Sequence, residues 1–256
     1  MGSLSREKWG FLTNHALVLV YVVLHPDSTV REISAGVGIT ERATLAIMRD
    51  LDADAIIERR RSGRRNTYAV NFAHLAAVRR GGVRTPLTPR LFVDTVVRML
   101  FTLSPSREAA RAVPPPVPAD ELEPRLGTWG FFTNHLLVLL QIARSGSRTV
   151  RELAASVGIT ERATAAILRQ LQDARVLVVR RDGRHNVYAI DLDAFRDFPR
   201  WTFGTWPLPQ ALIDVATDGV RGLIEAHAGA SLEVPSPDPA GGGSAASTSR
   251  TPISAP

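Results

Sequence analysis

Apolar and polar residues follow the same succession of patterns in two separate parts of the chain. In residues 9–75 an apolar run is followed by apolar positions at helical spacing, and then by strand-forming residues around a Ser-Gly pair. Residues 129–195 repeat this succession without a gap, and 33 of the 67 aligned positions are identical. This identity indicates a tandem duplication. We call residues 9–75 the first repeat and residues 129–195 the second repeat.

Three helices are predicted in each repeat, because a residue able to cap a helix precedes each helical segment. Thr13 precedes the first helix, which should end near Pro26 since proline disfavours helical backbone in the residue before it. Thr29 is followed three residues later by Glu32, the spacing of a capping box. Thr40 is the expected cap of the third helix. The equivalent residues of the second repeat are Thr133, Thr149 and Thr160.

A β-hairpin is predicted after the third helix of each repeat. Residues 62–63 (Ser-Gly) and 182–183 (Asp-Gly) separate strand-forming runs, and such pairs favour tight hairpin turns. The second and third helices are joined by a short turn at Gly38 or Gly158, which is typical of a helix-turn-helix. The predicted fold class is therefore mainly α with small β-hairpin wings (α+β), arranged as two tandem winged helix-turn-helix domains.

Each domain is expected to carry a trailing amphipathic helix, at residues 90–103 and 210–228, and we expect these two helices to pack together near a pseudo-two-fold axis. Proline-rich sequence separates the domains, and a tail rich in Pro, Gly, Ser and Ala is expected to be disordered. The predicted domains are 1–112 (first winged-helix repeat with its trailing helix), 113–128 (linker), 129–230 (second repeat with its trailing helix) and 231–256 (disordered tail).

The composition restricts the classes of function. A net charge of +6, from 31 basic and 25 acidic residues, is compatible with a nucleic-acid partner. The absence of cysteine excludes disulfides and thiolate chemistry, and no nucleophile elbow, H-E-x-x-H or phosphate-loop motif occurs. We therefore expect a non-enzymatic protein without a cofactor or metal. The longest apolar run, residues 16–24, is shorter than the roughly 20 residues of a membrane span, so a cytoplasmic, nucleoid-associated protein is expected.

Both repeats resemble winged-helix transcription regulators of the MarR-like kind, especially small actinobacterial regulators with an L-T-N-H…V-G-I-T-E-R-A…G-R-R-N-x-Y pattern. The resemblance covers the two repeats and leaves out the trailing helices, the linker and the tail. It implies that the third helix of each repeat enters the major groove of DNA and that the wing contacts the adjacent backbone or minor groove. The pattern stands at residues 12–15, 37–43 and 63–68, and again at residues 132–135, 157–163 and 183–188.

The middle of the third helix departs from this family pattern. Similar regulators usually carry polar or basic side chains there, whereas this chain has Leu45-Ala46 in the first repeat and Ala165-Ala166 in the second. These side chains cannot form hydrogen bonds to base edges, although an apolar side chain can contact a thymine methyl group. Base readout is therefore expected to rest on few residues.

The predicted DNA contacts lie on the third helix and on the hairpin of each repeat. Arg42 and Arg162 lie in the first turn of the third helices and are expected to reach bases, whereas Arg49 and Arg169 lie two turns further on and are expected to reach phosphates. Surface salt bridges are the competing interpretation for these four arginines. The predicted contacts of the first repeat are Thr40, Arg42, Arg49, Arg60, Arg61, Arg64, Arg65 and Asn66. Those of the second repeat are Thr160, Arg162, Arg169, Arg180, Arg181, Arg184, His185 and Asn186.

The two wings differ in charge. Residues 58–65 contain five arginines and one glutamate, whereas residues 178–185 contain three arginines and one aspartate. Because phosphate neutralisation drives sequence-independent binding, we predict that the first wing contributes more of that affinity. The competing interpretation is that nearby acidic residues neutralise the first wing locally.

Histidines and aromatic residues shared by both repeats leave alternatives open. His15 and His135 have no partners at metal-ligand spacing, so a structural role is favoured over a metal site. Tyr68 and Tyr188 fit either a phosphate contact or the core, because alternate residues of a strand face inward. The segments that fit either a ligand pocket or a seam between helices are Trp9, Trp129 and residues 201–206.

The sequence thus predicts a regulator that binds double-stranded DNA as a single-chain pseudo-dimer. The alternative is an architectural or protein-interaction winged-helix module with little sequence-specific readout, for which the apolar middles of the third helices argue. A further protein partner, self-association and a small-molecule effector are left open by the sequence.

Overall fold

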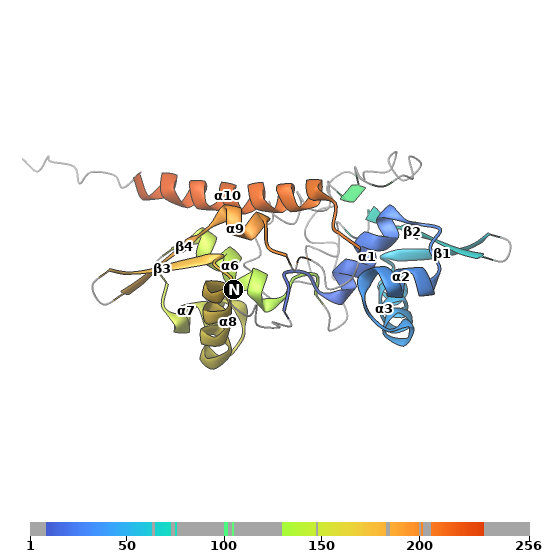
Figure 1. The fold of residues 1–256 in the computed structure, drawn as a ribbon, viewed down its shortest axis with the longest axis horizontal. Coiled ribbons are helices and arrows are strands. Elements are labelled where there is room, and N and C mark those ends of the chain that lie inside the picture. Colours follow the sequence, from blue (N-terminus) through green and yellow to red (C-terminus); the bar gives the residue numbers. More distant parts are fainter. Residues whose placement is uncertain are drawn as a thin grey trace, which may run out of the picture.

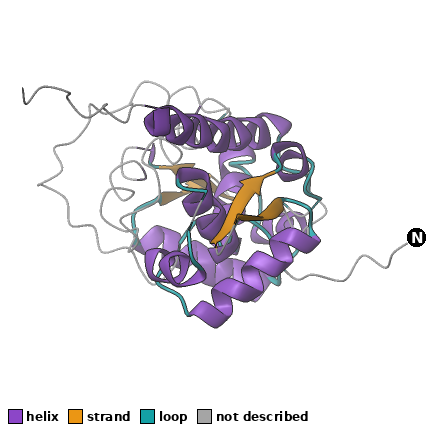
Figure 2. Cartoon of the chain, turned by 90° about the vertical axis from the view of Figure 1, so that its left-hand side faces the viewer, coloured by secondary structure: helices purple, strands orange, loops and turns teal. Residues whose placement is uncertain are grey.

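The computed structural model describes residues 9–62, 65–72, 75, 100–101, 104, 130–146, 148–182, 185–199, 201 and 206–232. Within these residues it contains eight helices and two antiparallel two-stranded sheets. Figure 2 shows that the strands are confined to the hairpins and that helices make up most of the fold. The predicted α+β class is confirmed at this level.

The same elements occur in both repeats at equivalent positions. The first repeat forms α1 (Asn14–Leu24), α2 (Val30–Val37), α3 (Glu41–Ala53), β1 (Ile57–Ser62) and β2 (Arg65–Val70). The second repeat forms α6 (Asn134–Arg144), α7 (Val150–Val157), α8 (Glu161–Asp173), β3 (Leu177–Asp182) and β4 (His185–Ile190). Two more helices follow, α9 (Leu192–Arg196) and α10 (Gln210–Leu232).

The predicted caps explain where most of these helices begin. Thr29 and Thr149 both form complete capping boxes, so this prediction is confirmed. The hydroxyls of Thr40 and Thr160 each accept a hydrogen bond from a backbone N–H of the following turn at 3.2 Å. α1 ends at Leu24, two residues before the proline expected to stop it.

Apolar residues at equivalent positions form the core of each repeat. Ile33 and Leu51 are fully buried in the first repeat, and Leu153 and Leu171 take their places in the second. Their helices, α2 and α3 or α7 and α8, are joined through Gly38 and Gly158, whose positive φ angles of 80° and 77° favour glycine.

A reciprocal backbone contact joins the two repeats at the segments that precede α1 and α6. Leu12 and Phe132 form an antiparallel bridge. The Thr13 N–H donates to the Phe131 carbonyl and the Thr133 N–H donates to the Phe11 carbonyl, both at 3.0 Å. The two threonine hydroxyls donate to the Gly130 and Gly10 carbonyls, both at 2.6 Å. Each hydrogen bond from the first repeat to the second has a counterpart between the equivalent residues in the opposite direction. Such reciprocal contacts are typical of two units related by a two-fold axis.

The trailing helix α10 packs on the second repeat, against α6 and α9. It begins at the predicted residue, Gln210, and extends four residues beyond the predicted end. Of the predicted helix at 90–103, only Leu100 and Phe101 are described, and Phe101 packs edge-on against Phe72 of the first repeat with ring centroids 5.3 Å apart. The expected pairing of the two trailing helices therefore stays a prediction. The linker at 113–128 and the tail beyond Leu232 lie outside the described residues.

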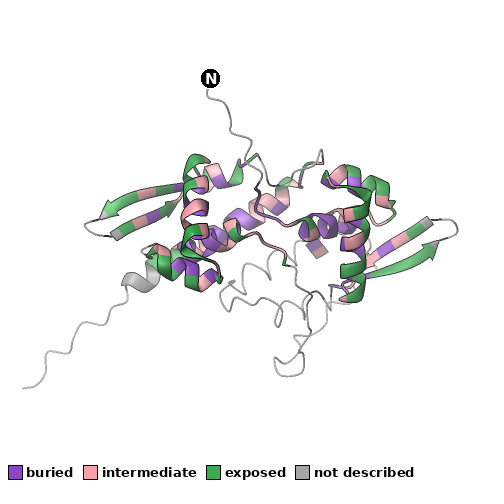
Figure 3. Cartoon of the chain, turned by 90° about the horizontal axis from the view of Figure 1, so that it is seen from below, coloured by how far each residue is buried: buried purple, intermediate pink, exposed green. Residues whose placement is uncertain are grey.

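The arrangement separates two sides of the molecule (Figure 1). α3 and α8 lie on one side, α10 crosses the opposite side, and the two hairpins project outward at opposite ends. The view from below shows exposed residues along both of these helices and along the outer parts of both hairpins (Figure 3). Within the described residues, no helix combines the length and apolar character needed to cross a bilayer.

Candidate nucleic-acid interface

α3 presents an arginine-bearing face to solvent. Arg42, Leu45 and Arg49 are exposed and follow one another at spacings of three and four residues, which places them on one face of the helix. The opposite face is fixed by burial of Thr44, Ile47, Met48 and Leu51. The core therefore orients the face that carries the predicted contacts.

α8 presents the equivalent face with a smaller residue at its centre. Arg162 and Arg169 are exposed, and Ala165 between them is partly buried. The buried positions are Thr164, Ile167, Leu168 and Leu171, equivalent to those of α3. The two helices thus share a pair of arginines and differ in the apolar side chain between them.

The arginines in the first turns are available to a partner. Among the described residues, no acidic side chain forms an ion pair with Arg42 or Arg162, so the competing salt-bridge interpretation has no support at these two positions. Arg49 lies back along its own helix, where its Nε donates to the Leu45 carbonyl at 3.2 Å. The Thr40 and Thr160 hydroxyls serve as helix caps.

The first hairpin carries an acidic partner for one of its arginines. Arg59, Arg60 and Arg61 are all exposed. The Arg60 guanidinium lies 3.2 Å from the Glu58 carboxylate, because residues two apart in a strand share a face. Part of the charge of this wing is therefore neutralised locally. Arg64 lies outside the described residues, and so does the side chain of Arg65, the first residue of β2.

The second hairpin has an apolar residue where the first has the glutamate. Val178 takes the place of Glu58 and is 43% exposed, beside the exposed Arg180. Val187 is partly exposed on the same face of the hairpin, opposite Arg180 in the register. Arg181 is exposed as well. Arg184 and the side chain of His185, the first residue of β4, lie outside the described residues.

The asparagine and tyrosine that both hairpins share separate into a surface pair and a core pair. Asn66 and Asn186 are exposed, and each lies opposite an exposed arginine in the hairpin register. Tyr68 and Tyr188 are buried, at 7% and 5% exposure. The packing interpretation therefore holds for the tyrosines, and the asparagines stay candidate phosphate contacts.

The shared histidines make structural contacts in both repeats. His15 Nε2 lies 3.1 Å from Asp50 Oδ2, and His135 Nε2 lies 2.8 Å from Gln170 Oε1, so each histidine links the first and third helices of its repeat. Trp9 stacks on the His135 ring with centroids 4.2 Å apart. The indole therefore fills a seam between the repeats.

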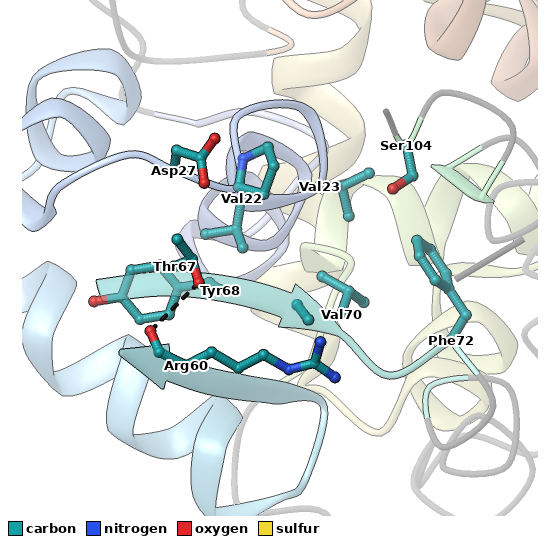
Figure 4. A pocket seen from close by; sticks show the side chains of 11 residues that line it. Val22, Val23, Asp27, Arg60, Thr67, Tyr68, Val70, Phe72 and Ser104 are labelled. Atoms are coloured by element: carbon teal, nitrogen blue, oxygen red, sulfur yellow. Dashed lines mark hydrogen bonds between the residues drawn. The ribbon is translucent and has the colours of Figure 1, made fainter. Parts of the chain in front are cut away.

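A cavity of about 220 Å³ lies between the end of α1 and the base of the first hairpin (Figure 4). Val22, Val70 and Phe72 supply apolar walls, and Asp27 and Arg60 supply charged groups. Trp9, Trp201 and Trp206 do not line this cavity, and Trp129 and residues 202–205 lie outside the described residues.

Comparisons with known proteins identify no relative of this chain. Neither a protein-family model, nor a curated protein, nor a solved structure gives a significant match to the chain. Within the described residues, no three His, Asp or Glu side chains gather where they could hold a metal ion. The arginine-bearing surfaces of α3, α8 and the hairpins remain the chemically distinctive feature.

Proposed function

We propose that the protein is a DNA-binding transcriptional regulator that acts as a single-chain pseudo-dimer of two MarR-like winged-helix modules. α3 and α8 enter the major groove, and the two hairpins contact the backbone or the minor groove. One observation carries this proposal: α3 and α8, which both expose arginines, lie on the same side of a molecule whose halves are joined by a reciprocal contact.

The symmetry of DNA gives that observation its meaning. The two strands of a duplex are related by two-fold axes, and paired winged helices use this symmetry by placing two helices in major grooves about 34–36 Å apart. Exposed arginines attract phosphates without regard to sequence, and those at the start of a helix can also reach base edges. Because the two repeats are not identical, the expected binding site is an imperfect inverted repeat.

Selection of duplexes from a random library by the full chain tests this function. The expected result is an enriched imperfect inverted repeat. Arg42→Ala and Arg162→Ala should each weaken binding to it by about 1–3 kcal/mol, the usual value of a good base contact, and should relax the preference in one half-site. Arg221→Ala is the matched control, because Arg221 is an exposed arginine on α10, on the opposite side of the molecule.

An unchanged affinity and preference in both variants would contradict the assignment of α3 and α8 as contact helices. Failure of the chain to bind any duplex at low salt would contradict the function itself.

A second candidate is an architectural module that binds a protein partner and DNA of any sequence. The exposed Val178 favours this candidate, because Val187 lies on the same hairpin face and the two form an adjacent apolar pair, and contiguous exposed apolar surface marks protein contacts. Binding to all duplexes with equal affinity, and no enriched site, is the outcome that would select it over the first.

A further inference from the structure

Leu45 is a large apolar side chain exposed in the middle of a polar helix face. It is 48% exposed, although it belongs to a helix whose other large apolar residues are buried. Arg42 lies one turn before it and Arg49 lies two turns after Arg42, so a cation flanks the leucine on either side. Leu45 does not belong to the hydrophobic core of the described residues.

The fold does not require leucine at this position. The second repeat forms the equivalent helix with Ala165 there, and the same four positions of that helix are buried. Alanine is also the better helix former. Packing and helix stability therefore do not explain the leucine at position 45. Contact of this side chain with a binding partner does explain it.

We propose that Leu45 determines the base preference of α3 by contacting the C5 methyl group of a thymine in the major groove. This inference rests on the proposed DNA-binding function. Thymine alone among the four bases presents a methyl group in the major groove, and an apolar side chain is its natural partner. Arg42, one turn before Leu45, is placed to reach a base edge next to such a contact, and Arg49, one turn after it, is complementary to a phosphate.

The two halves of the binding site then differ in a defined way. Leu45 extends further from its helix than Ala165 does, so the half-site under α3 requires thymine more strongly than the half-site under α8. The protein therefore binds its site in one orientation, with the first repeat on the thymine-dependent half.

Replacement of thymidine by deoxyuridine isolates this contact, because the two nucleosides differ only in the C5 methyl group of the base. The probe is a duplex enriched by the full chain from a random library, with each thymine replaced in turn and affinity measured by fluorescence anisotropy. We expect one replacement in one half-site to weaken binding about 3- to 5-fold, the effect of withdrawing one methyl group from a buried contact.

Exchange of residues between the repeats supplies matched variants. Leu45→Ala should bind the thymine and deoxyuridine duplexes equally, and Ala165→Leu should create a new deoxyuridine effect in the other half-site. Deoxyuridine without effect on the parent, or an effect that persists in Leu45→Ala, would overturn the inference and leave the proposed function standing. Absence of binding to every duplex would overturn both.

Discussion

The hairpins of the two repeats pair in the same register and yet expose different side chains. Tyr68 and Tyr188 point into equivalent cores. On the outer surface, the first hairpin carries the Glu58–Arg60 ion pair, whereas the second carries Val178 beside Arg180. Packing holds the inner face of each hairpin constant, and the outer face is free to differ. The differences between the repeats therefore point to differences in what the two halves contact.

The contact between the repeats shows the same combination of symmetry and difference. Its backbone hydrogen bonds are reciprocal, but its side chains are not used equally. Phe11 is fully buried, and its ring centroid lies 4.9 Å from that of Phe195, the last residue of the second repeat, and 5.2 Å from that of Trp201, which follows the repeat. The equivalent Phe131 is only half-buried. The first repeat thus inserts its phenylalanine into the second more deeply than the reverse.

The largest expected effect follows from this inequality. Phe11→Ala should lower the free energy of unfolding by about 3–5 kcal/mol, because it leaves a cavity among aromatic rings. Phe131→Ala is the matched substitution and should cost clearly less, since that side chain already contacts solvent. Denaturant unfolding of both variants measures the difference. Equal losses would show that the two phenylalanines are equivalent in solution.

A smaller effect tests how Trp206, which lies between α9 and α10, packs against the first repeat. The backbone N–H of Trp206 donates to the Gly36 carbonyl at 3.3 Å, and the Trp206 ring packs edge-on against the Tyr21 ring with centroids 5.1 Å apart. A Cβ on Gly36 would overlap the Tyr21 ring. Gly36→Ala should therefore destabilise the protein by about 1–3 kcal/mol through overpacking, although alanine normally stabilises a helix relative to glycine.

The second repeat supplies the control for this substitution. Its equivalents of Gly36 and Tyr21 are Ser156 and Gln141, so a Cβ is already present. Ser156→Ala should change the free energy of unfolding little. A stabilising Gly36→Ala would contradict the overlap.

Local sequence signals predicted most of the elements within each repeat. The caps at Thr29 and Thr40, the end of α1 before Pro26 and the hairpins all depend on residues only a few positions apart. The exposure of Arg42 and Arg162 also follows from helical spacing, once the buried face of each helix is assigned.

The contacts between the repeats carried no local signal, because each partner lies more than a hundred residues away in the chain. Thr13 caps α1, as its position before the helix predicts, but its hydroxyl also donates to the Gly130 carbonyl. Thr133 makes no side-chain cap hydrogen bond, and its hydroxyl donates to the Gly10 carbonyl instead. The one available sign was that residues 9–11 and 13–15 are identical in both repeats, as a reciprocal contact favours.

The smallest expected effect concerns the charge of the two wings. The first wing has more arginines, but the Glu58 carboxylate pairs with Arg60, whereas Val178 leaves Arg180 without that partner. Exposed pairs of this kind contribute only about 0–1 kcal/mol to stability, so exchange of these residues should leave the fold intact.

Glu58→Val should free Arg60 for phosphate and steepen the log–log dependence of DNA affinity on salt by up to about 0.9, the value for one neutralised phosphate. Val178→Glu should flatten that dependence by a similar amount. Salt titrations of both variants on one duplex at pH 8 measure the slopes. Unchanged slopes would mean that neither Arg60 nor Arg180 contacts the backbone, and the wings would then owe their affinity to other arginines.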